Sequence, residues 1–105
     1  MTSDEQPLPA NDCLSMADVR SGVDAIDQAL VAMIARRFAY MDAAARIKSD
    51  RNIVRDEARK RAVLDNVIAA ARTHNVPVEL AEQLWDTLVE ASIAYELDRW
   101  DDLRA

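Results

Sequence analysis

The longest uninterrupted helical pattern in this sequence is the feature that most constrains its fold. No proline occurs between Pro9 and Pro77. From Ser15 onward, residues with helical spacing of four and three form one row: Val19, Val23, Ile26, Leu30, Met33, Arg37, Tyr40, Ala44 and Ile47. All but one of them are apolar, and Ser15 with Asp18 fits a capped start. The spacing predicts one helix of about 33 residues, about 50 Å long.

A helix of this length exceeds what the chain can enclose. A compact chain of 100 residues has a radius of gyration of about 13 Å, and two shorter helices cover only part of the row. We therefore expect a second copy to cover the remainder, most simply as a two-fold homodimer. The alternative is a break at Gly22, because glycine inside a helix costs about 1 kcal/mol. The row passes Gly22 without a change of phase, which favours the continuous helix.

The rest of the chain predicts two shorter helices. After a turn at 49–52, a helix begins near Asp56 and ends at 74–76, where Asn75 suits a C-terminal cap. Its inner face is expected to hold Lys60, Leu64, Val67, Ile68 and Ala71. A third helix begins at Pro77, with an inner row of Leu80 or Ala81, then Leu84, Leu88, Ala91, Ser92 and Tyr95. No alternating strand pattern occurs. The prediction is an all-α fold of three helices over 15–105, preceded by a flexible lead-in over 1–14.

Composition excludes several classes of protein. The single glycine rules out a glycine-rich phosphate loop, and one cysteine with one histidine excludes an internal disulfide and disfavours a zinc cluster. No apolar run approaches the roughly 20 residues of a membrane span. The first residues lack the basic start and apolar stretch of a secretion signal. These features predict a soluble, cytoplasmic protein.

Charge is distributed unevenly. The chain carries a net charge of −6, yet residues 36–61 hold nine basic and four acidic side chains. A basic segment in an acidic protein is a candidate anion site, the alternative being a solvated, ion-paired helix surface. Nucleic acid is disfavoured because the whole domain is acidic, and because Trp85 and Trp100 are not interleaved with the basic residues.

Several basic residues fall on inward faces of the predicted helices. Arg37 and Lys48 are eleven residues apart and so share a face, with backbones about 16 Å apart. Polar residues at inner or edge positions of the other two helices are Asp56, Arg59, Lys60, Ser92 and Glu96. Because buried cations need partners or ligands, this pattern predicts a pocket for a small molecule that carries carboxylates. Arg20 lies about 25 Å before Arg37 and about 100° around the helix, so it reaches such a pocket only from an antiparallel partner.

These positions resemble the all-helical chorismate mutase family over nearly the whole chain after Asn11. The matching stretches are Val19-Arg20, Asp24-Ala25-Ile26-Asp27, Ala35-Arg36-Arg37, Lys48, Val54-Arg55-Asp56 with Arg59, and Ser92 with Glu96. The lead-in Asp12-Cys13 followed by Ala17-Asp18-Val19-Arg20 is similar to the isochorismate-pyruvate lyase branch. Both branches are intertwined dimers without a metal or cofactor, so the resemblance implies the same here.

The resemblance also implies roles for individual residues. Arg37 and the partner subunit's Arg20 hold the two substrate carboxylates, and Lys48 lies by the ether oxygen of the breaking C–O bond. Arg59 and Ser92 complete the anion site, and Asp56 lies near the ring hydroxyl. The reaction is pericyclic and needs no nucleophile.

Two positions differ from the mutase pattern. Many relatives have Gln, a donor to the ether oxygen, at the position of Glu96. Glu96 can donate only when protonated, so we expect a rate that falls as pH rises and that Glu96→Gln flattens. At Lys60, a mutase carries a Glu that binds the ring 4-hydroxyl, which opens isochorismate or a related ring as a substrate.

Three hypotheses follow. The first is a dimeric chorismate mutase that forms prephenate. The second is a lyase that converts isochorismate to salicylate and pyruvate, favoured by Lys60 and the Asp12-Cys13 lead-in. The third is a non-catalytic helical dimer, against which the clustered inward cations argue. Asp56 and Arg59 favour the mutase.

Overall fold

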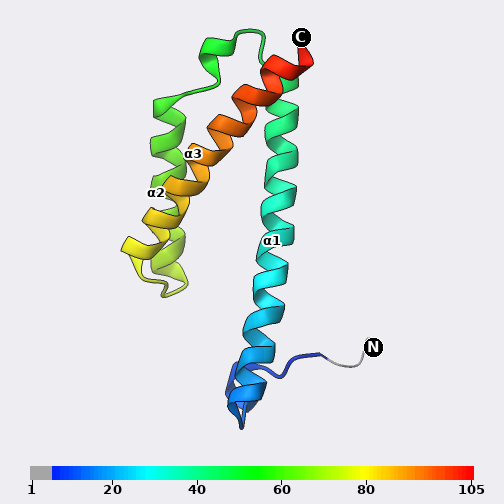
Figure 1. Ribbon diagram of the computed structural model, residues 1–105. Coiled ribbons are helices and arrows are strands. Elements are labelled where there is room, and N and C mark those ends of the chain that lie inside the picture. Colours follow the sequence, from blue (N-terminus) through cyan, green and yellow to red (C-terminus); the bar gives the residue numbers. More distant parts are fainter. Residues whose placement is uncertain (1–5) are drawn as a thin grey trace. The chain divides into compact units, whose positions relative to one another are not determined.

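The computed structural model describes residues 6–105, and the first five residues of the predicted lead-in lie outside this range. It contains three α-helices and two short 3₁₀ turns, with no strand among the described residues. The helices are α1 (Met16–Ile47), α2 (Glu57–Thr73) and α3 (Val78–Leu103), and the turns are η1 (Ala10–Asp12) and η2 (Arg51–Ile53). Figure 1 shows their order along the chain. The all-helical prediction, with one long first helix, is confirmed.

Helix α1 runs for 32 residues without interruption, so the predicted continuous helix is confirmed and the alternative, a break at Gly22, does not occur. Its start is fixed by a reciprocal cap: the Asp18 amide donates to Ser15 Oγ at 3.2 Å, and the Leu14 amide donates to Asp18 Oδ2 at 3.0 Å. Local capping chemistry therefore begins the helix where the sequence predicts it.

The boundary between α2 and α3 also follows local chemistry. Asp56 caps α2 by accepting the Arg59 amide at 3.0 Å. At the other end Asn75 has a φ of 58°, the left-handed conformation that asparagine tolerates. The Val76 amide donates to Ala71 O at 2.8 Å, which closes a Schellman turn and stops the helix before Pro77.

The chain divides into two compact units, Met1–Arg37 and Phe38–Ala105, and α1 continues from one into the other. In the N-terminal unit, η1 precedes the exposed first half of α1. In the C-terminal unit, α2 and α3 pack side by side, and the end of α3 lies beside the end of α1 (Figure 1). No helix in the described range is long and apolar enough to cross a membrane.

All residues classed as buried in the described chain lie in the C-terminal unit: Ala45, Val54, Leu64, Ala71, Ala81, Val89, Ser92 and Glu96. The predicted inner face of α2 is therefore confirmed at Leu64 and Ala71. In the predicted row on α3, Ala81, the alternative to Leu80, and Ser92 are confirmed as buried, whereas Leu84 and Ala91 are wrong, because they are exposed within the chain. The row that packs starts at Ala81. Two adjacent apolar rows run along this helix, and spacing alone does not say which one meets α2.

Candidate active site

Lys48 follows directly on α1, and its ammonium group meets Glu96 on α3. Lys48 Nζ lies 2.8 Å from Glu96 Oε2, and only 5% of the Glu96 side chain is exposed. Lys48 Nζ also donates to the carbonyl oxygen of Val54 at 3.4 Å. These contacts join the end of α1, the segment before α2 and the last turns of α3, so the fold brings together two of the predicted site residues.

The Glu96 carboxylate is incompletely satisfied. Apart from the ion pair with Lys48, its buried oxygen Oε2 has no hydrogen-bond partner of proper geometry among the described residues. A buried polar atom without such a partner costs about 1–3 kcal/mol, and natural proteins keep few of them. Burial of this carboxylate beside a single cation is costly for stability, which makes Glu96 a candidate for contact with a ligand.

Ser92 lies one turn before Glu96 on the same helix and is equally buried. Its hydroxyl donates to the carbonyl oxygen of Leu88 at 2.7 Å. Ser92 and Glu96 are therefore the polar members of an otherwise apolar buried row.

Asp56 and Arg59 lie together at the first turn of α2. One carboxylate oxygen of Asp56 accepts the backbone amide of Arg59, while the second has no hydrogen-bond partner in residues 6–105. The Arg59 guanidinium is exposed and makes no ion pair with the described residues. The turn thus presents an open acceptor and an uncompensated cation, the kinds of group predicted there.

Lys60 has a different environment from the one that the sequence suggests. Its ammonium lies 2.8 Å from Glu90 and 3.0 Å from Asp86 on α3. Arg55 binds the same Glu90 carboxylate through two nitrogens, at 2.7 and 3.1 Å. Hydrogen bonds from Arg55 and then Lys60 lower the pKa of Glu90 to about 2, and the bonds to Glu90 and Asp86 raise the pKa of Lys60. The charge of Lys60 is neutralised across the α2–α3 contact.

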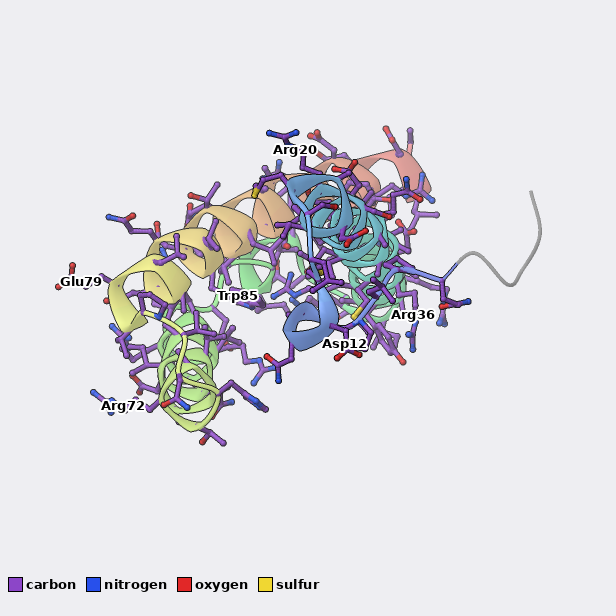
Figure 2. All side chains as sticks on the ribbon, turned by 90° about the horizontal axis from the view of Figure 1, so that it is seen from below. Asp12, Arg20, Arg36, Arg72, Glu79 and Trp85 are labelled. Atoms are coloured by element: carbon purple, nitrogen blue, oxygen red, sulfur yellow. The ribbon has the colours of Figure 1, made fainter. Side chains whose placement is uncertain are left out.

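The remaining predicted residues, Arg20 and Arg37, lie on α1 in the N-terminal unit. Arg37 is half-buried, whereas Arg20 is exposed, and Figure 2 shows its side chain extending away from the helix. Their participation in a site with Lys48 is part of the proposal below.

A second polar cluster, which the sequence did not predict, ties α3 to α1 next to Lys48. Asp42 accepts hydrogen bonds from the Tyr95 hydroxyl at 2.7 Å and from Arg99 Nε at 3.0 Å. The Tyr95 ring packs edge-on against Phe38, with centroids 4.9 Å apart. The bond to Asp42 raises the pKa of Tyr95, so the hydroxyl stays protonated as the donor. The i, i+4 spacing of Tyr95 and Arg99 was the only signal available in the sequence.

Comparison with known proteins adds the family. The model of a family described as chorismate mutase type II matches residues 19–97. This chain belongs to that family. It is also similar to a protein named isochorismate pyruvate lyase from Pseudomonas aeruginosa, with 28% identity over 93 residues that cover 89% of this chain and 92% of the relative. The resemblance drawn from the sequence is therefore confirmed at the level of the family, and a catalytic role in chorismate-related chemistry follows.

Proposed function

We propose that the protein is a chorismate mutase that rearranges chorismate to prephenate. Lys48 and Glu96 act at the ether oxygen, and Arg59 and Ser92 complete the anion site. The cations hold the substrate with its enolpyruvyl arm folded over the ring, which supplies much of the rate enhancement of an intramolecular reaction. As the C–O bond lengthens, the Lys48 ammonium group stabilises the negative charge that develops on that oxygen, and Glu96 holds this ammonium group at 2.8 Å.

The neutralisation of Lys60 is the observation that carries the choice of chorismate. In the sequence, a cation at this position argues against recognition of the ring 4-hydroxyl. With Glu90 and Asp86 at 2.8 and 3.0 Å, Lys60 is occupied as a partner for α3. Asp56 keeps an open carboxylate oxygen one turn away and supplies the acceptor for the hydroxyl.

The second candidate, an isochorismate-pyruvate lyase, is favoured by the similarity to the Pseudomonas aeruginosa protein of that name. The deciding experiment supplies purified chorismate and isochorismate separately and identifies prephenate, or salicylate with pyruvate, as products. Preferred turnover of chorismate is expected. Preferred turnover of isochorismate contradicts the mutase and supports the lyase. If neither substrate is turned over, the non-catalytic helical dimer is the hypothesis that remains.

Matched variants test the assigned residues on the better substrate. Arg59→Ala is expected to lower kcat/KM at least tenfold, since charge-assisted contacts contribute about 1.5–3 kcal/mol. Arg72→Ala is the control, because Arg72 lies on the same helix, is exposed, and projects outward in Figure 2. Equal effects of the two substitutions would remove Arg59 from the site.

The proposal includes a homodimer in which the partner subunit's Arg20 completes each site. The exposed apolar row of α1 supports it: Ile26 and Met33 are about three-fifths exposed within the chain. Arg20→Ala and Lys48→Ala chains, each strongly impaired alone, are expected to regain about a quarter of wild-type activity when mixed. Half of randomly formed dimers are mixed, and each of these holds one intact site. Arg37→Ala mixed with Lys48→Ala is the control and should regain nothing, because those two residues belong to the same site.

A further inference from the structure

The last turn of α1 ends with carbonyl groups that the helix does not satisfy. The Lys48 amide donates to Ala44 O at 2.9 Å, which is the final bond of the helical series. The carbonyl oxygens of the residues after Ala44 therefore need partners from outside the helix. Ala45, which is fully buried, is one of them.

The end of α3 supplies these partners. Arg104 donates from Nη1 to Ala45 O at 3.0 Å and from Nη2 to Lys48 O at 2.7 Å. Trp100 Nε1 donates to the same Lys48 carbonyl oxygen at 3.0 Å. The Arg104 guanidinium also lies over the Trp100 ring, 4.1 Å from its centroid, so the two donors brace each other. A cation at the C-terminal end of a helix is additionally favoured by the helix dipole.

Both the main chain and the side-chain ammonium group of Lys48 are thus held in place. Trp100 and Arg104 fix its main chain, and Glu96 fixes its ammonium group at 2.8 Å. All of the groups that hold it, apart from Val54, come from the last turns of α3. The reach of the lysine side chain toward the reacting atoms depends on where its main chain stands.

We propose that Trp100 and Arg104 are positioning residues for Lys48, which aim its ammonium group at the reacting oxygen. The catalytic part of this inference rests on the proposed function. Neither residue touches the substrate: each acts through the Lys48 carbonyl.

Kinetics give the first test. Arg104→Ala is expected to lower kcat about tenfold to hundredfold with KM within about threefold, the range that a displacement of about 1 Å produces. Trp100→Phe keeps the ring and removes one donor, so a smaller loss is expected. In a Lys48→Ala background, Arg104→Ala should cost nothing further, because the residue that it positions is gone.

Arg51→Ala is the matched control. Arg51 binds Asp101 on the same end of α3 through two nitrogens, at 2.8 and 3.1 Å, but does not contact Lys48. Its removal should lower stability without changing kcat per folded molecule, and its effect should add to that of Lys48→Ala. If Arg104→Ala does not fold, Arg104→Lys keeps the charge and one donor, and the same cycle applies to it.

A second readout is independent of activity. Lys48 and Lys60 are the only lysines in the sequence. Brief acetylation followed by mass spectrometry therefore gives the reactivity of Lys48 relative to Lys60, an internal reference with its own ion pairs. We expect the ratio to rise several-fold in Arg104→Ala and Trp100→Phe and to stay at the wild-type value in Arg51→Ala.

The two readouts separate the two proposals. A raised ratio in a protein that turns over neither substrate supports the positioning of Lys48 and overturns the proposed function. Normal turnover with an unchanged ratio and an unchanged kcat in Arg104→Ala overturns the positioning role. Additive losses in the Lys48→Ala background overturn it as well.

Discussion

The two units of the chain differ in whether their apolar side chains are buried or exposed. In the C-terminal unit, Val54, Leu64 and Val89 are buried among α2, α3 and the end of α1. In the N-terminal unit, Val23, Ile26 and Leu30 form a row on α1 that is at least half exposed. The C-terminal unit therefore has a packed core of its own, whereas the apolar row of the N-terminal unit is not covered within the chain.

Truncation of the core is expected to have the largest effect. Leu64→Ala removes a side chain that is 6% exposed and should destabilise the protein by about 2–5 kcal/mol. Urea denaturation measures it. Because the lost contacts lie within one chain, the change should be the same at low and high protein concentration. A concentration-dependent change would place Leu64 in an interface and break the comparison.

A charge on the exposed row tests the other unit. Leu30→Asp is expected to weaken self-association by about 30-fold or more, which corresponds to about 2 kcal/mol for a central interface residue. Analytical ultracentrifugation gives the dissociation constant. Gln28→Asp, on the opposite side of α1, is the control and should associate as the wild type does. If Leu30→Asp also leaves association unchanged, the row has another occupant.

Acid should act on the C-terminal unit through Glu90. The pKa of Glu90 in the folded protein is lowered to about 2 from an ordinary value of 4.5 by Arg55 and Lys60. Its contribution to stability is therefore complete above about pH 4.5 and is lost as pH falls toward 2. The urea midpoint of Glu90→Gln should be lower than that of the wild type at pH 6, and the two should converge near pH 2.

Glu79→Gln is the control for this titration. Glu79 lies on the same helix, is exposed, has no ion pair within residues 6–105, and points outward in Figure 2. Its midpoint should follow that of the wild type at every pH. A constant gap between Glu90→Gln and the wild type down to pH 2 would show that the ion pairs do not carry the effect.

The smallest expected effect is a gain in the N-terminal unit. A Cβ added at Gly22 meets no atom within 4 Å, so alanine should stabilise α1 by up to about 1 kcal/mol. Thermal denaturation measures it. If alanine destabilises the protein instead, another chain occupies the space beside Gly22, which would support the N-terminal unit as an interface.

Helix boundaries were predictable because their causes are local. Ser15 with Asp18, Asp56, and Asn75 each act within a few residues of themselves, and each caps the helix that the spacing predicts. The pairing of Lys48 with Glu96 could also be predicted from the sequence, since both residues fall on inward faces of their helices. Family membership then followed from the pattern of charged residues and from the comparison.

What was missed depends on how the helices meet. The partners of Lys60 depend on how α3 packs against its neighbours, and so do the hydrogen bonds from Trp100 and Arg104 to the end of α1. For the same reason the start of the inner row of α3 stayed open between Leu80 and Ala81, and Leu84 and Ala91 were wrongly placed in that row. A sequence shows which faces are apolar or charged, but the identity of the facing residue is a property of tertiary packing.

The unbroken course of α1 has a consequence for how this protein can change. Between Arg20 and Arg37 the helix sets both the distance between the two arginines and their relative orientation around the helix axis. Deleting one residue rotates one arginine against the other by about 100°, whereas deleting seven shortens the span by about 10 Å and rotates it by only about 20°. The number of residues between Arg20 and Arg37 therefore matters more than the identity of most of them. In the proposed homodimer, the loss of a single codon there would harm the shared site more than most replacements of a side chain.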